Sequence, residues 1–276
     1  MKTSNFILST FTVVAISSNP VMASTLIMND FDGDDTNDLG GVFVPVSNNL
    51  EDMDMTNPSV GLISFQDDGS SNPAVGFTSS TAADFSSFGG FTIEWTVASG
   101  FNTADIRSNG WFLGVQDAVG VNNSSATLWN NDPDAVGVTL FRSGGATAAE
   151  FAESFAVNGN GENFVSVGSI NNTVVEDGFT ISLTLNSDDT WSVSSTGLDA
   201  GSGELSGSGV LASGSGLYAT FADSLFASSV VQINSVPTGV VSGGQFTSVT
   251  VTAIPEPSSL ALLSLAALAG SVRRRR

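Results

Sequence analysis

The feature that most restricts the fold is a strict alternation of apolar and polar side chains in two seven-residue segments. Residues 91–97 read FTIEWTV and residues 179–185 read FTISLTL, so every second side chain is apolar. Successive side chains of a β-strand point to opposite faces of a sheet, so this period of two predicts strands with one buried face. In the first segment Trp95 lies on the apolar face, and Glu94 lies on the opposite, solvent-facing side.

The second segment continues into a predicted hairpin, because residues 186–189 (NSDD) favour a turn and residues 190–196 (TWSVSST) favour a return strand. The helix candidates are weak and comprise residues 81–88 and 146–155. Further strands are expected at residues 24–29, 42–46, 59–65, 111–115, 136–141, 163–167, 217–226, 229–234 and 246–253. So many one-faced strands cannot all be buried in a single sheet. The sequence therefore predicts an all-β fold of two packed antiparallel sheets, a β-sandwich.

The first 23 residues have the composition of a secretion signal peptide. Lys2 precedes an apolar run at residues 6–16, which is too short to span a bilayer, and Ala23 supplies the small residue that a signal peptidase requires. We therefore expect export through the Sec machinery, with cleavage after Ala23.

The C-terminal end has three parts: a Pro-Glu-Pro triplet, an apolar segment at residues 260–272, and an arginine cluster. The triplet is Pro255, Glu256 and Pro257, and the cluster is Arg273, Arg274, Arg275 and Arg276. The apolar segment is shorter than the roughly 20 residues of a stable transmembrane helix. The arginines should stay in the cytoplasm. This predicts a short transmembrane helix that holds the chain transiently in the inner membrane, with the preceding domain outside.

The tail at residues 254–276 resembles the PEP-CTERM sorting signal of Gram-negative bacteria, since all three of its parts are present in order. The resemblance implies processing near the triplet by an exosortase, a membrane-embedded enzyme similar to cysteine peptidases. It also implies a final location at the cell surface or in the extracellular matrix. Hosts of this system typically make exopolysaccharide and grow as biofilm or floc.

Residues 24–253 are expected to form one domain, because no linker or internal repeat divides them. A first strand followed by an Asp- and Gly-rich turn, a central strand at 91–97, and a last strand that runs directly into Pro-Glu-Pro form one pattern. This pattern resembles the concanavalin-like jelly-roll domains that often precede such a tail. The resemblance implies that the first and last strands lie side by side.

The chain is strongly acidic and poor in reactive side chains. It has 27 acidic and 7 basic residues, a formal net charge of −20, no His and no Cys. Nucleic acid is excluded as a partner, because phosphate binding needs clustered Lys and Arg. The absence of His and Cys also excludes catalytic triads, thiol nucleophiles and imidazole metal sites. We therefore expect a protein that is not an enzyme.

Carboxylate chemistry is the remaining route to catalysis, and Glu94 is the acid that lies well inside an alternating strand. Its same-face neighbours, Thr92 and Thr96, are not acids. Jelly-roll glucanases carry two catalytic carboxylates on one strand, so here a second carboxylate would have to come from another strand, within roughly 5–10 Å. We favour a solvated Glu94, with a glycosidase site as the alternative.

A cluster of aspartates follows the first predicted strand. Asp30, Asp32, Asp34 and Asp38 take the first, third, fifth and ninth positions of a loop, and Ca²⁺ prefers such oxygen ligands. The loop departs from the EF-hand pattern, because Gly33 is at the fourth position rather than the sixth and no glutamate is at the twelfth. An acidic turn exposed to water is the favoured interpretation, and a calcium site is the alternative.

Trp129, with Asn130, Asn131 and Asp132, is the best candidate for a sugar-binding cluster. An exposed aromatic ring can stack on a sugar while neighbouring polar side chains bind its hydroxyls. Packing of Trp129 in the core or at a sheet edge is the favoured alternative, because 19 Phe and one Tyr are typical of core filling. Trp111 lies in an apolar strand and is predicted to be buried.

These features together predict an exported, exosortase-processed surface or matrix protein that contacts exopolysaccharide. A purely structural or adhesive biofilm protein without a defined ligand is one alternative. A glycoside hydrolase or lyase of the jelly-roll type is the other. Retention of polysaccharide and release of sugar distinguish the three.

Overall fold

The computed structural model describes most of the predicted β-domain. The described residues are 25–29, 43–47, 53–59, 62–67, 74–97, 101–102, 111–118, 134–143, 146–155, 161–171, 174–175, 178–198, 203–212, 216, 218–219, 222–232 and 243–256. They belong to one compact unit, Ala23–Glu256, and the second unit comprises Met1–Met22 and Pro257–Arg276. Within the described ranges, no helix has the length and hydropathy needed to cross a membrane. The predicted signal peptide and C-terminal helix lie outside these ranges.

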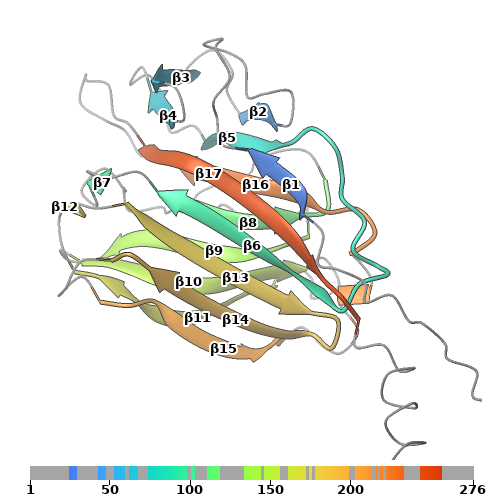
Figure 1. Cartoon of the computed structure of the whole chain (residues 1–276). Coiled ribbons are helices and arrows are strands. Elements are labelled where there is room, and N and C mark those ends of the chain that lie inside the picture. Colours follow the sequence, from blue (N-terminus) through green and yellow to red (C-terminus); the bar gives the residue numbers. More distant parts are fainter. Residues whose placement is uncertain are drawn as a thin grey trace, which may run out of the picture. The chain divides into compact units, whose positions relative to one another are not determined.

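The described residues form β-strands almost throughout (Figure 1). The strands are β1 (Thr25–Asn29), β2 (Phe43–Ser47), β3 (Met53–Ser59), β4 (Leu62–Asp67), β5 (Ala74–Ser79), β6 (Gly90–Val97), β7 (Phe101–Asn102), β8 (Trp111–Gln116), β9 (Ala135–Ser143), β10 (Ala146–Phe155), β11 (Gly161–Ile170), β12 (Val174–Val175), β13 (Phe179–Asn186), β14 (Thr190–Thr196), β15 (Ser206–Val210), β16 (Phe226–Gln232) and β17 (Gly243–Ile254). This architecture confirms the predicted all-β fold class.

The strands pair into two large antiparallel sheets, which we call sheet A and sheet B. Sheet A has the order β15-β14-β13-β6-β17-β4-β3, and β1 pairs with the second half of β17. Sheet B has the order β11-β10-β9-β8-β16-β5-β2, and β7 and β12 form a small two-stranded sheet. The first strand, β1, therefore lies beside the last, β17 (Figure 1), as the resemblance to jelly rolls implied.

The alternation of the sequence is reproduced in the burial of β6 and β13. Burial alternates residue by residue along β13, and Trp95 of β6 is buried, as predicted. On the outer face, the hydroxyls of Thr92 and Thr184 lie 2.9 Å apart in a hydrogen bond between the two strands. For Trp111, the structure describes the strand, β8, and the prediction for its side chain is untested.

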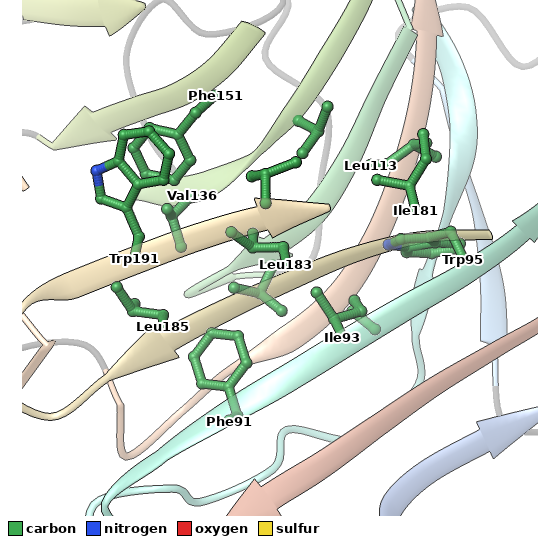
Figure 2. Packing of buried hydrophobic residues seen from close by; sticks show 14 of the residues in the cluster. Phe91, Ile93, Trp95, Leu113, Val136, Phe151, Ile181, Leu183, Leu185 and Trp191 are labelled. Atoms are coloured by element: carbon green, nitrogen blue, oxygen red, sulfur yellow. The ribbon is translucent and has the colours of Figure 1, made fainter. Parts of the chain in front are cut away.

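The core lies between the two sheets, and Figure 2 shows large side chains from both. The rings of Trp191 in sheet A and Phe151 in sheet B stack with centroids 3.9 Å apart and planes 9° from parallel. Full burial of a side chain such as Phe contributes about 1.5–3 kcal/mol. This stacked pair therefore helps to hold β10 against β14.

Two buried carboxylates fasten the segment that follows β15. Asp189, in the turn between β13 and β14, accepts hydrogen bonds from the backbone N–H groups of Gly216 and Tyr218, the latter at 2.8 Å. Glu153 of β10 accepts one from the backbone N–H of Ala212 at 2.8 Å. Hydrogen bonds to charged acceptors are among the stronger ones in proteins. These two side chains therefore anchor an irregular segment to both sheets.

The helix prediction for residues 146–155 is wrong, because this segment is strand β10. Its Ala and Glu residues have high helix propensity. However, Ala149 and Phe151 point into the core, while Ala148 and Glu150, which alternate with them, are less buried, so the period is two. Pairing with β9 and β11 along the whole strand outweighs the local propensity.

Three other expectations differ from the structure. Residues 81–88 form no helix; Ala83 makes a single β-bridge to Leu225, and a turn follows. The strand predicted at 217–226 is replaced by a helical turn at Tyr218 and a second turn, and the strand begins at Phe226. Strands β3, β5 and β15 were not predicted, because their polar or glycine-rich sequences lack a clean alternation.

Candidate ligand-binding face

The side of sheet B that faces away from the core has a distinct set of side chains. Leu113 and Val115 of β8 and Val138 of β9 belong to the core between the sheets. Because side chains alternate, Phe112, Gly114, Gly137 and Thr139 point to the opposite, outer face. Phe112 is assigned to a separate apolar cluster outside the main core, which agrees with this direction.

A row of small residues crosses the middle of this outer face. Adjacent members of the row are directly paired between neighbouring strands, and the row comprises Thr78, Ser228, Gly114, Gly137 and Ala152. A Cβ added to Gly114 or Gly137 would overlap the ring of Phe112, so the ring lies across the two glycines. Glycine is therefore required at both positions to seat this ring.

The row ends at the edge strand β11, where an aromatic ring is accessible. Phe164 is paired with Ala152 and is 40% exposed. Beside it on the same face, Ser166 is paired with Glu150, which is paired in turn with Thr139. We call these five residues, Thr139, Glu150, Ala152, Phe164 and Ser166, the β9–β11 face.

The polar groups of the β9–β11 face are arranged in an unusual way. The hydroxyl of Thr139 is buried, with the residue 5% exposed, and it has no hydrogen-bond partner in the described part of the chain. Its cross-strand neighbour Glu150 is half-buried, and this burial raises the pKa of its carboxyl group. A buried hydroxyl without a partner costs about 1–3 kcal/mol, so such groups are few in native proteins.

Two more hydroxyls continue this pattern further along the row. Thr78 and Ser228 are paired across β5 and β16, both are fully buried, and neither hydroxyl has a partner among the described residues. They lie on the covered part of the outer face, whereas Ser166 and Phe164 lie on its accessible part. Within the β9–β11 face, a molecule in solution can therefore reach Phe164, Ser166 and part of Glu150, whereas Thr139 and Ala152 are buried beneath the surface.

The β9–β11 face combines apolar and polar groups. An accessible ring, small neighbours, hydroxyls and one carboxyl group offer an apolar platform next to donors and acceptors. Among the described residues, no group of three acids, His or Cys could hold a metal ion.

Glu94, the acid that the sequence singled out, lies on the outer face of sheet A. It is exposed and accepts a hydrogen bond from the Ser182 hydroxyl at 3.0 Å. Its paired neighbours are Ser182 and Thr250, and neither is an acid. The outward, solvated position that we favoured from the sequence is therefore confirmed.

The other predicted sites fall mostly outside the described residues. These are the signal cleavage residue Ala23, the calcium candidates Asp30, Asp32, Asp34 and Asp38, and the sugar-binding candidates Trp129, Asn130, Asn131 and Asp132. Of the sorting signal, Pro255 and Glu256 are described, at the end of β17, while Pro257 and the four arginines are not.

The β9–β11 face was missed in the sequence, and the reason is the misassigned segment 146–155. A helix there separates Glu150 from Thr139. The paired glycines in FLGV (112–115) and AVGV (135–138) were the available signal, but only the strand register places them opposite each other.

Comparison with known proteins first identifies the C-terminus. The family model for the PEP-CTERM protein-sorting motif matches residues 253–276, which confirms the resemblance of the tail. This motif implies an exported, surface-associated bacterial protein. Sequence comparison finds no match among curated proteins.

Solved structures identify the fold of the domain. Arcelin-5, a lectin-like defense protein from Phaseolus vulgaris, is 10% identical over 83% of this chain and 97% of its own, with a TM-score of 0.54. The lectin from Bauhinia forficata in complex with GalNAc is 10% identical over 85% and 98%, with a TM-score of 0.51. The exoplasmic domain of VIP36 in its Ca²⁺/Man2-bound form is 6% identical over 83% and 87%, with a TM-score of 0.51. The domain therefore has the lectin-like jelly-roll fold.

Proposed function

We propose that the chain is an exported, exosortase-processed protein of the bacterial surface or matrix, and that its domain binds extracellular polysaccharide through the β9–β11 face without cleaving it. The sorting motif supports the location. The fold supports the kind of ligand, since the similar Bauhinia lectin and VIP36 structures contain GalNAc and Man2.

One observation carries the proposal. The exposed ring of Phe164 lies on the same outer face of sheet B as the exposed Ser166, which is paired with the half-buried Glu150. A sugar presents both hydroxyls and an apolar ring face. It could therefore bind the Glu150 carboxyl group and the Ser166 hydroxyl while its ring packs on Phe164.

The negative charge of the chain favours a neutral polysaccharide as the ligand. The net charge of −20 repels polymers that carry carboxylates or sulfates, and the described β9–β11 face adds the negative Glu150. A neutral polymer avoids this repulsion and retains the hydroxyls that the face can bind.

Calcium binding and catalysis are separate from the binding of polysaccharide. We propose that Asp30, Asp32, Asp34 and Asp38 hold Ca²⁺ as a structural ion, a proposal to which the Ca²⁺-bound form of VIP36 adds support. Melting with and without a chelator tests it, and an unchanged melting temperature would reject it. We propose no catalytic role for Glu94, because its paired neighbours are not acids.

Retention of the purified domain on an insoluble neutral polysaccharide tests the function. Phe164→Ala should abolish retention, because it removes an exposed ring without opening the core. Val210→Ala is the matched control, since Val210 is 61% exposed at the edge of sheet A and should leave retention unchanged.

The other outcomes separate the alternatives. Equal retention of the two variants would show that the binding site lies outside the β9–β11 face. No retention on any neutral polymer would favour a structural protein without a ligand. Release of soluble sugar that disappears in Glu94→Gln would establish a hydrolase or lyase.

A further inference from the structure

The last residues before the predicted membrane segment are part of the folded sheet. Ile254 of β17 is paired with Gly90 of β6, and Thr252 is paired with Thr92 on one side and with Thr25 of β1 on the other. β17 is therefore an interior strand up to Thr252, and its last two residues, Ala253 and Ile254, are paired with β6 on one edge. Removing an interior strand from a sheet breaks hydrogen bonds on both sides and exposes core residues, so it requires much of the domain to open.

A turn at residues 85–90 holds the two residues that follow β17. The backbone N–H of Gly89 donates to the carbonyl of Ile254 at 2.8 Å, and the carbonyl of Gly89 accepts from Ser187 at 2.9 Å. A Cβ on Gly89 would lie 3.0 Å from the carbonyl oxygen of Pro255 and 3.2 Å from Cα of Glu256. The backbone of Pro255 and Glu256 thus packs directly on Gly89. We call residues 85–90 the seat.

Tyr218 also contacts the seat. Its hydroxyl donates to the carbonyl of Phe85 in the seat at 2.9 Å. Burial raises the pKa of Tyr218, and the negative charges of Asp84 and Glu256 raise it further. The side chain of Glu256 is exposed but lies within electrostatic reach of this buried phenol.

We propose that the seat fixes the position of C-terminal processing, so that the cut falls on the C-terminal side of Glu256 and the mature domain keeps Pro255 and Glu256. This inference rests on the processing that the proposed function includes. Proteases commonly bind their substrates as extended segments whose backbone groups are free to pair. The bonds up to that between Pro255 and Glu256 are paired in β17 or packed on Gly89, so a protease that needs a free extended backbone would have to bind the chain beyond them.

The intact mass of the chain released from bacteria that contain the processing enzyme tests the position. We expect a C-terminus at Glu256 or beyond. A chain that ends at Pro255 or earlier, or one that keeps its arginines, would overturn the inference. Retention on polysaccharide is measured on the same material. A cut at another position with retention intact would leave the binding function standing, and lost retention with the expected mass would refute only the binding.

Two variants test the seat itself. Gly89→Val places a side chain against Pro255 and Glu256, and products cut upstream of Glu256 should appear. Gly89→Ala should give a smaller share of them if the larger variant does not fold. Ser192→Val adds similar bulk at an exposed position of β14 and should leave the products unchanged. An unchanged product pattern in both Gly89 variants would contradict the role of the seat.

A measurement without the processing enzyme is also available, because Tyr218 is the single tyrosine of the chain. In protein labelled at tyrosine, Glu256→Gln should lower the pKa of Tyr218 and shift its NMR signals. Asp223→Asn, at an exposed position of a turn that follows Tyr218 by five residues, is the comparison variant and should have a smaller effect. Identical tyrosine signals in the native chain and Glu256→Gln would show that Glu256 is not held near the seat.

Discussion

Replacing Thr139 by valine should make the domain more stable. The two side chains have nearly the same shape, so the change removes the hydroxyl and leaves the packing of the 5%-exposed site intact. The hydroxyl has no partner in the described part of the chain, and relief of such a group is worth about 1–3 kcal/mol. For a domain of this size, each kcal/mol raises the melting temperature by about 2–4 °C.

Thermal unfolding followed by circular dichroism measures this effect, and Ser79→Ala provides the matched contrast. Ser79 is also buried in sheet B, but its hydroxyl accepts from the backbone N–H of Ala227 at 3.1 Å and donates to the carbonyl of Thr81 at 3.2 Å. Ser79→Ala should therefore lower stability by about 1–3 kcal/mol. A loss of stability in Thr139→Val would refute the reasoning, because it would mean that the hydroxyl is already satisfied in the free domain.

Three further predictions concern other parts of the fold. Asp189→Ala should lower the free energy of unfolding by about 2–5 kcal/mol in urea titrations, because it leaves the N–H of Tyr218 without its acceptor. Replacing its exposed neighbour, Asp188→Ala, should cost less than about 1 kcal/mol. Equal losses in the two variants would contradict the anchoring role of Asp189. The pKa of Glu150 is raised in the folded state, so the domain should lose stability as pH rises from the pKa of this group in the unfolded chain to its pKa in the folded one. Glu150→Gln should remove this loss. The same pH profile of stability in the native chain and the variant would contradict this role of Glu150. Gly137→Ala should destabilise the domain by about 1–3 kcal/mol through overlap with the aromatic ring above it, and a neutral effect on the melting temperature would show that the ring can move aside.

The parts of the fold that sequence reasoning predicted are those in which local pattern and tertiary packing agree. β6 and β13 alternate cleanly, and one face of each is buried. β10 was mistaken for a helix because alanine and glutamate favour helices, and its strand form depends on partners distant in the chain. β15 reads SGSGV, and its glycines make room for Val167 and for the ring of Trp191, which no local pattern indicates.

The candidate sites differ in the same way. The sorting motif is contiguous, so its residues could be recognised directly from the sequence, including Pro255 and Glu256. The β9–β11 face combines three strands, and its members come together only through the register of β9, β10 and β11. The seat likewise depends on a contact between Gly89 and Pro255, which are far apart in the sequence.

A structure of the domain with a bound neutral oligosaccharide tests the central claim most directly. We predict a sugar ring packed on Phe164, with a sugar hydroxyl within hydrogen-bond distance of the Glu150 carboxyl group or the Ser166 hydroxyl. A sugar bound elsewhere, with Phe164 and Glu150 free of ligand contacts, would contradict the account.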